Sequence, residues 1–116
     1  MKRICTIAAV VTAAAVAAGS AGAATPKLAG MVNDQFKISV TKSGKKVKTL
    51  KAGTYLLVVT DKTSAHNFHI TGPGVNKTTS VSGKKVVTWK LKLKKGVYKY
   101  VCDPHKSFMK GSFTVK

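Results

Sequence analysis

The sequence predicts an all-β protein, an antiparallel Greek-key β-sandwich of seven to eight strands, preceded by an N-terminal signal peptide. Apolar and polar residues alternate with a period of two in several short runs, which is the pattern of strands buried on one face. Gly, Pro, Ser and Asp separate these runs at short intervals, as they do in turns. No segment after residue 24 has the periodicity of an amphipathic helix.

Residues 1–23 have the features of a secretory signal peptide. A basic start at residues 1–3 precedes an apolar, Ala-rich run, and Ala-Gly-Ala at 21–23 forms a small-x-small cleavage site. We expect cleavage after Ala23 or Ala24, and hence export to the periplasm or the cell exterior. The alternative is an uncleaved membrane anchor, because the apolar run approaches the ~20 residues that span a bilayer.

The exported part is predicted to form one domain. Removal of the signal peptide leaves about 93 residues, which is enough for a single hydrophobic core. We expect residues 24–34 to be a flexible arm and residues 35–116 to be the folded domain. We also expect a monomer that does not insert stably into a membrane once the signal peptide is removed.

The first predicted strands are residues 35–40 and 46–50, since both alternate apolar and polar side chains. Residues 55–60 are apolar and β-branched, as is typical of a central strand. Residues 66–71 form another strand, which ends at Gly-Pro-Gly.

Residues 84–94 alternate most cleanly, because Trp89 and Leu91 share one face and Lys90 and Lys92 the other. A Lys-Gly turn then leads into residues 97–102, and residues 111–115 form the last strand.

The charge is strongly one-sided, with 21 Lys and Arg residues against 3 Asp and Glu, giving a formal net charge of +18. Such a field favours encounters with acidic partners or anionic surfaces, although it can also serve only solubility. We do not expect a nucleic-acid partner, because the lysines are spread along the strands and no Arg follows residue 3.

Cys102 is the single thiol of the exported part, because Cys5 lies in the signal peptide. An unpaired cysteine in an exported protein indicates a reactive thiol or a metal ligand, the alternative being an inert buried residue. His105 and Met109 follow within seven positions. Thiolate, imidazole and thioether are the ligands that hold copper in electron-transfer sites. The nearby His105 and Met109 therefore favour Cys102 as a metal ligand over Cys102 as an inert buried residue.

Strand parity predicts which side chains meet inside the sandwich. Cys102 shares the inward face of its strand with Tyr100, and Met109 falls on the inward side when the parity of the last strand is extended back. On the strand at 66–71, His66 shares the inward face with apolar residues, whereas His69 points outward. We therefore expect His66 as the fourth ligand and His69 on the surface.

Asp103 and Pro104 match the first two positions of a type I turn, which would bring His105 back beside the thiolate. Pro104 has no N–H to donate to the Cys102 sulfur, so more electron density stays on the thiolate. Asp103 either serves only this turn and points away, or also tunes the metal by favouring Cu(II).

The chain from about residue 35 to 116 resembles the cupredoxins, the small blue-copper proteins. Three segments carry the resemblance: Ala-His-Asn at 65–67, Tyr-Val-Cys-Asp-Pro-His at 100–105 with Met109, and the closing strand Gly-Ser-Phe-Thr-Val at 111–115. Two features depart from the best-known members, namely Asp103 and the three residues between His105 and Met109.

The resemblance implies roles for these residues. His66, Cys102 and His105 would be the strong trigonal ligands of one type 1 copper ion that cycles between Cu(I) and Cu(II), with Met109 as the long axial ligand. Asn67 would tie the His66 strand to the Cys102 loop. Phe108 would lie in an apolar partner patch around His105, or would serve only in packing.

We expect the protein to transfer single electrons between redox partners whose docking surfaces are acidic. The alternative is an exported copper-binding or copper-handling protein outside any electron-transfer chain, and a third reading is a structural domain with a vestigial site. We do not expect an enzyme. The sequence shows no nucleophile with a base, no carboxylate pair and no glycine-rich phosphate loop. A multicopper oxidase or nitrite reductase would need further histidine-bound coppers, and only His69 remains after His66 and His105.

Overall fold

The computed structural model describes residues 24–116, so the predicted signal peptide at 1–23 lies outside the described residues. Within the described part, we find no helix with the length and apolar character needed to cross a membrane.

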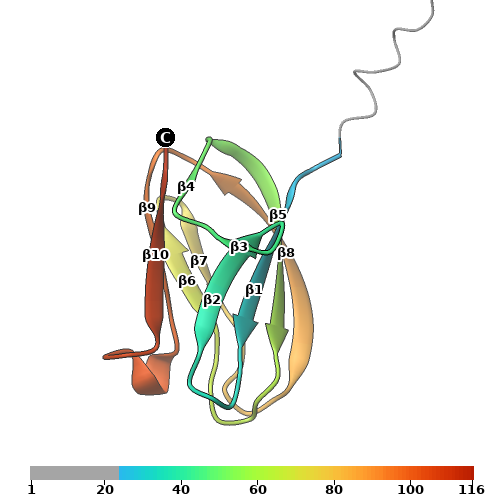
Figure 1. Ribbon diagram of the computed structural model, residues 1–116, viewed down its shortest axis with the longest axis vertical. Helices are drawn as coiled ribbons and strands as arrows, with labels where there is room; N and C mark the ends of the chain where they lie inside the picture. The colour runs from blue at the N-terminus through green and yellow to red at the C-terminus, as the bar shows by residue number, and fades with distance from the viewer. Residues whose placement is uncertain (1–23) are drawn as a thin grey trace, which may run out of the picture.

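The described chain forms two five-stranded sheets that pack against each other as a sandwich (Figure 1). The first sheet contains, in pairing order, β3 (Lys45–Lys46), β2 (Ile38–Lys42), β1 (Lys27–Val32), β5 (Gly53–Asp61) and β8 (Lys85–Leu93). The second contains β4 (Thr49–Leu50), β10 (Lys110–Val115), β9 (Gly96–Val101), β6 (His69–Gly72) and β7 (Val75–Thr78). The predicted all-β sandwich is confirmed.

The sheets are mixed rather than purely antiparallel, which corrects the prediction. β1 runs parallel to β5, and β4 runs parallel to β10, while the other pairs are antiparallel. Residues 24–116 contain ten strands instead of seven to eight, because β1 and β7 were not predicted and the run at 46–50 is divided between β3 and β4. The chain passes from one sheet to the other five times, and such crossings bring distant segments to the same end of the sandwich.

The prediction of a flexible arm at 24–34 was wrong, since β1 occupies most of it. β1 lies between β2 and β5 in the middle of the first sheet, and both neighbours hydrogen-bond to it. Leu28 and Val32 point into the core, and between them Gly30 leaves room for the Phe68 ring. The segment is therefore held by partners that are distant in the sequence.

Three other predicted strands have different limits. The run at 46–50 is divided, because the chain crosses from β3 in one sheet to β4 in the other around the buried Val47. The strand predicted at 35–40 begins only at Ile38, and the one predicted at 66–71 begins only at His69.

The core lies between the sheets and contains the inward side chains of both. Its largest fully buried members are Tyr98, Tyr100 and Phe68. Tyr100 stacks on Phe68 at 5.7 Å between ring centroids, and Tyr98 stacks on Phe113 at 5.4 Å. Burial of each such ring contributes about 1.5–3 kcal/mol. The rings make a stiff frame directly behind the end of β9.

Three of the connections at the end of the sandwich opposite the C-terminus lie around the predicted ligands (Figure 1). They are the β1–β2 turn, the loop between β5 and β6, and the segment from β9 to β10 that contains the 3₁₀ turn η2 (Asp103–His105). The predicted ligands all lie on the second and third of these connections.

Candidate metal centre

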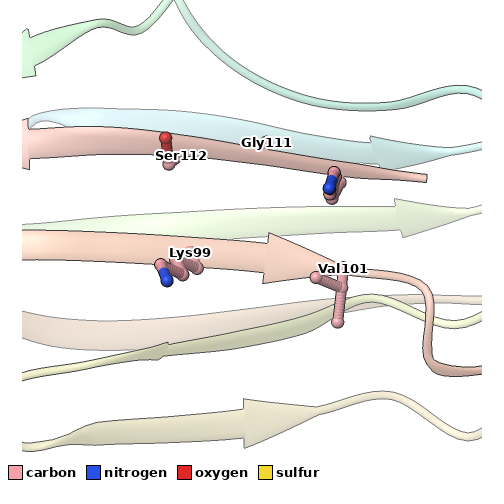
Figure 2. A pocket seen from close by; sticks show the side chains of 5 residues that line it. Lys99, Val101, Gly111 and Ser112 are labelled. Carbon is pink, nitrogen blue, oxygen red and sulfur yellow. The ribbon is translucent and has the colours of Figure 1, made fainter. Parts of the chain in front are cut away.

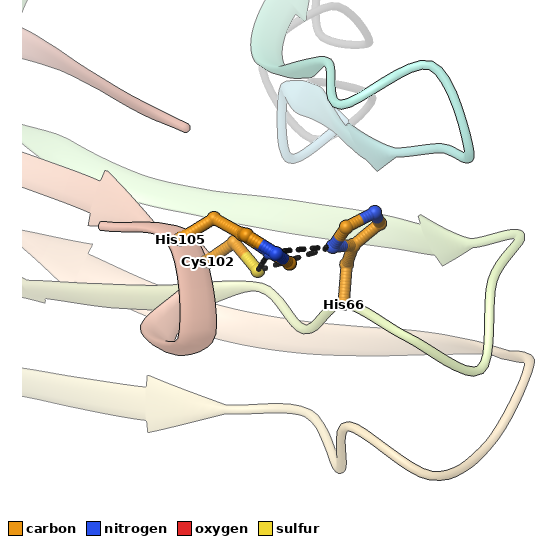
Figure 3. Close-up of side chains that lie close together, drawn as sticks. All are labelled: His66, Cys102 and His105. Atoms are coloured by element: carbon orange, nitrogen blue, oxygen red, sulfur yellow. Dashed lines mark hydrogen bonds between the residues drawn. The ribbon is translucent and has the colours of Figure 1, made fainter. Parts of the chain in front are cut away.

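Three donor atoms converge at this end of the sandwich (Figure 3). The Nδ1 atoms of His66 and His105 lie 3.0 Å apart, and each lies 3.6 Å from the Sγ atom of Cys102. His66 and Cys102 are buried and His105 is partly exposed. Residues 39 positions apart in the chain thus present one nitrogen each to one thiol.

The spacing of these atoms fits a metal ion. By plane geometry, the point equidistant from the three atoms lies about 2.0 Å from each, close to the ~2.0–2.3 Å of metal–imidazole and metal–thiolate bonds. Two imidazoles and one thiolate in a trigonal arrangement are the donor set of a soft or borderline transition metal. The residues therefore fit the kind of ion that the sequence predicted.

The segment from Cys102 to Met109 is closed by its own backbone. The amide of His105 donates to the Cys102 carbonyl at 3.0 Å, and the amide of Met109 donates to the His105 carbonyl at 2.8 Å. The Cys102 amide then donates to the Met109 carbonyl at 3.0 Å. These bonds bring Met109, which is only 1% exposed, to the same end of the core as the three donor atoms.

The turn has a different register from the predicted one. Since the Cys102 carbonyl accepts from His105, Cys102 is the first residue of the turn, and Asp103 and Pro104 are its second and third. Pro104 lies exposed near the start of η2, where its missing N–H leaves no donor unsatisfied. The functional result is the one expected, because His105 returns to the thiol.

His66 is positioned by a buried polar network that sequence reasoning missed. Asp61, at the end of β5, accepts hydrogen bonds from the Thr63 amide and the Thr79 hydroxyl. Thr63 in turn accepts from the Ala65 amide, and Thr79 accepts from the Phe68 amide. The network fixes the backbone on both sides of His66. No periodic pattern in the sequence marks it.

Burial raises the pKa of the Asp61 carboxyl above its ordinary value, against the opposing effects of Thr63, Thr79 and the charges of His66 and Lys85. The carboxylate is thus held in the core at a cost in desolvation.

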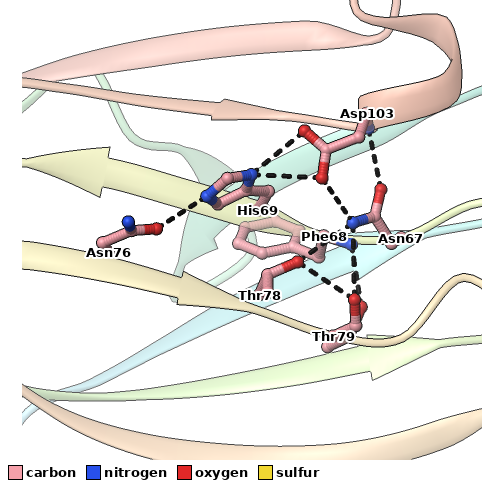
Figure 4. A network of polar contacts seen from close by, with 7 residues as sticks. All are labelled: Asn67, Phe68, His69, Asn76, Thr78, Thr79 and Asp103. Carbon is pink, nitrogen blue, oxygen red and sulfur yellow. Dashed lines mark hydrogen bonds and ion pairs between the residues drawn. The ribbon is translucent and has the colours of Figure 1, made fainter.

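Asn67 and Asp103 join the two ligand-bearing segments by a reciprocal pair of hydrogen bonds (Figure 4). The Asp103 amide donates to Asn67 Oδ1 at 2.8 Å, and Asn67 Nδ2 donates to Asp103 Oδ2 at 2.8 Å. Asn67 directly follows His66, and Asp103 directly follows Cys102. The pair therefore fixes the distance between the two buried donors, the kind of contact expected of Asn67.

His69 lies outside the cluster of donor atoms, on the outer side of β6. Its Nδ1 lies 3.0 Å from Asp103 Oδ1, and its Nε2 lies 2.7 Å from Asn76 Oδ1. The carboxylate of Asp103 therefore faces Asn67 and His69. Of the two alternatives for Asp103, this orientation favours the one in which it points away from the metal.

Two exposed phenylalanines flank the partly exposed imidazole. Phe108, which the sequence suggested, is 58% exposed and its ring centroid lies 5.5 Å from that of His105. Phe36 was missed, because it was assigned to a strand. It lies instead in the β1–β2 turn with φ = 60°, and its ring makes edge contacts with both His66 and His105. The two rings make an apolar rim over the site.

A shallow groove of about 400 Å³ is separate from the metal centre (Figure 2). It lies on the outer face of β9 and β10, and its lining residues are Lys99, Val101, Lys110, Gly111 and Ser112. The groove contains no donor atom of the cluster, but Val101 immediately precedes Cys102 and Lys110 immediately follows Met109.

The fold is shared with solved structures of low sequence identity. Reduced rusticyanin is 21% identical, with 78% of each chain covered and a TM-score of 0.55. Rusticyanin from Thiobacillus ferrooxidans is 22% identical, with 78% of this chain and 76% of that chain covered and a TM-score of 0.50. A chain of a heme-copper terminal oxidase dimer is 21% identical, with 84% and 68% covered and a TM-score of 0.55. A search of curated proteins gave no significant match.

The family assignment rests on the sequence itself. Residues 6–115 match the cupredoxin-like domain family, which is nearly the full length of the 116-residue chain. The two-sheet fold and the His-Cys-His cluster at the end of β9 agree with this match. The chain belongs to the cupredoxin-like domain family.

Proposed function

We propose that this chain is an exported small blue-copper protein that carries single electrons between redox partners. The observation that carries the proposal is the convergence of two imidazole nitrogens on one buried thiol, with sides of 3.0, 3.6 and 3.6 Å. A trigonal His₂Cys set with a weak axial thioether is the donor set of blue-copper electron-transfer sites. The likeness to rusticyanin, a copper protein, supports copper as the metal.

His66, Cys102 and His105 would be the strong ligands, and Met109 the axial one. Met109 is buried and is tied through its backbone to both Cys102 and His105, which supports this role. When bound, copper supplies a one-electron couple between Cu(I) and Cu(II). Zinc is a weaker candidate, because a thioether is not one of its usual ligands.

The surrounding residues would keep the ligands in one arrangement through both oxidation states. The Asn67–Asp103 pair and the Asp61 network hold the two ligand-bearing loops, and the stacked core rings hold the end of β9. Ligands that stay in place need little reorganisation when an electron arrives or leaves. Burial of His66 and Cys102 excludes water from the thiolate side.

His105 would be the route for the electron, since it is the one ligand of the triad with exposed surface. Phe36 and Phe108 form an apolar rim around it, against which a partner could dock closely. In each cycle a reduced partner gives one electron and an oxidised partner takes it, so the chain is left unchanged.

Export and the nature of the partners form part of the same proposal. The basic start, apolar run and Ala-Gly-Ala site at residues 1–23 support a signal peptide and a periplasmic or extracellular location. The net charge of +18 supports partners with acidic docking surfaces.

The test is to produce the protein from its full sequence, add Cu(II), and record visible and electron paramagnetic resonance spectra. An intense blue thiolate-to-copper band with a narrow hyperfine splitting is expected. A colourless protein that binds Cu(I) tightly would instead favour the second candidate function, copper handling outside an electron-transfer chain, which the thiolate ligand also permits. Absence of copper binding would contradict both.

A further inference from the structure

His69 makes two polar contacts that the metal centre itself does not require. It begins β6 on the outer face of the second sheet and is 26% exposed. Its ring lies between the carboxylate of Asp103 and the side chain of Asn76 (Figure 4). Its register partner on β9 is Val101, the residue before Cys102.

The partners of His69 determine its protonation state. The Asp103 carboxylate can only accept a hydrogen bond, and the Asn76 atom that faces Nε2 is the carbonyl oxygen Oδ1, which also accepts. In this arrangement both ring nitrogens face acceptor oxygens, which favours a proton on each and hence the imidazolium cation. Partial burial lowers the pKa of His69, but the bonds to Asp103 and Asn76 and the Asp103 charge outweigh it, and the pKa is raised.

Asp103 is consequently bound on two sides. Asn67 donates to Oδ2 at 2.8 Å, while the His69 ring lies 3.0 Å from Oδ1 and 3.1 Å from Oδ2. The residue next to the thiolate thus carries a negative charge that an adjacent cation compensates. Without His69, the carboxylate would keep the hydrogen bond from Asn67 and the influence of the Lys106 charge, but it would lose the cation in direct contact with it and one of the contacts that orient it.

We propose that His69, itself oriented by Asn76, is a positioning residue that holds the Asp103 carboxylate away from the Cys102 thiolate and compensates its charge. It thereby keeps the reduction potential of the copper site from falling. This inference rests on the proposed function, since it concerns how that same site is tuned. An uncompensated carboxylate near the metal stabilises Cu(II) over Cu(I), which lowers the potential.

The experiment compares four variants of the full-length protein with wild type. His69→Phe removes both donors, Asp103→Asn removes the charge, and the double variant removes both. Lys110→Gln is the matched control, because Lys110 pairs with Val101 from the opposite side and also loses one positive charge. The midpoint potential of the copper-loaded protein is measured for each at one pH and ionic strength.

His69→Phe is expected to lower the potential, so that the equilibrium constant for reduction falls several-fold, and more than in Lys110→Gln. In the Asp103→Asn background the same change should have little effect, because the carboxylate it would release is absent. The blue band should persist in all four variants. A fall equal to that of Lys110→Gln, or one that persists fully in the double variant, would overturn the proposal.

The metal-free protein provides a second measurement. Nitrogen-15 chemical shifts of the His69 ring at pH 6 should report two protonated nitrogens in wild type and a lost Asp103 contact in Asp103→Asn. A neutral His69 ring in wild type would overturn the proposed charge compensation of Asp103 by His69, even if copper binding failed. A cationic ring in a protein that forms no blue site would support this charge compensation and reject the proposed function. His69→Gln, which keeps one donor without the charge, replaces His69→Phe if the latter does not fold.

Discussion

Cys102 carries the proposed spectroscopic and redox chemistry, because a thiolate is the one ligand of the triad that gives an intense charge-transfer band with Cu(II). Its side chain is fully buried against both imidazoles. Replacement by Ser keeps the size but offers a hydroxyl that stays protonated at neutral pH. We expect Cys102→Ser to lose the blue band completely, as measured by visible absorption after Cu(II) addition.

The control for this prediction is His69→Ala, which removes the imidazole that lies outside the cluster of donor atoms. It should retain the blue band, although the potential is expected to change. Colour that survives Cys102→Ser, or that disappears in His69→Ala, would show that the ligands are assigned wrongly.

Asp61 is expected to give the metal-free protein a specific pH dependence. Burial raises its pKa in the folded chain above the ordinary 3.8 of the unfolded chain. Between these two values the folded chain binds more protons, so the stability that Asp61 contributes is lost as pH rises through this window. Asp61→Asn cannot ionise and keeps an oxygen for the Thr63 amide. Its stability relative to wild type should therefore increase from pH 3 to pH 7, as measured by urea unfolding.

Asp34→Asn controls for the loss of one negative charge, since Asp34 is exposed in the β1–β2 turn. A difference between Asp61→Asn and wild type that stays constant across the pH range would argue that the buried carboxylate does not titrate as described.

The three donor residues could be predicted because their chemistry is rare in this chain. Residues 24–116 have one cysteine and three histidines, and parity separated His66 from His69 correctly although the strand begins only at His69. Phe36 and Asp61 could not be predicted. The position of Phe36 follows from a positive φ in a turn, and that of Asp61 from hydrogen bonds to residues on other segments.

Among the strands, those with a local signal were predicted and those made by distant pairing were not. The alternation along β8 and the apolar run of β5 are visible in the sequence, and both strands exist within two residues of the predicted limits. β1 contains Ala29 and Gly30 and few β-branched residues, so nothing local indicates a strand. It forms because β2 and β5 present their edges to it.

The start of β10 is sensitive to side-chain size, because Gly111 faces the ring of Tyr100 across the sheet. A Cβ atom added at Gly111 would overlap that ring, and Tyr100 is fully buried and stacked on Phe68, so it cannot move aside. We expect Gly111→Ala to lower the free energy of unfolding by about 1–3 kcal/mol, the usual cost of overpacking. Urea unfolding of the metal-free protein measures this loss.

Gly83→Ala is the matched control, since the nearest atom to an added Cβ there is Lys85 Cε at an ordinary 3.7 Å. It should change stability by less than about 0.5 kcal/mol, as is usual for surface substitutions. Equal effects of the two variants would show that Tyr100 has more freedom than its packing suggests.

The molecule as a whole combines a stiff two-sheet frame with a strongly basic surface. The frame holds the three connections that build the metal centre at one end (Figure 1). The sequence has three acidic residues. Asp61 is buried, Asp103 interacts with Asn67 and His69, and Asp34 is exposed. The positive field is therefore almost uncompensated.

Lysines close to the metal centre should contribute more than distant ones to electron exchange with an anionic partner, because charges beyond a Debye length of about 8–10 Å are largely screened. Lys99 and Lys110 line the groove beside the end of β9, whereas Lys90 and Lys92 lie on the outer edge strand of the other sheet. Hexacyanoferrate(III), an anionic one-electron oxidant, serves as the probe in stopped-flow oxidation of the reduced protein. At low salt we expect Lys99→Gln/Lys110→Gln to lower the second-order rate constant several-fold, and Lys90→Gln/Lys92→Gln, which removes the same charge, to lower it less. The difference should vanish at high salt. Equal losses in the two double variants would mean that net charge alone attracts the partner, wherever on the surface the lysines lie.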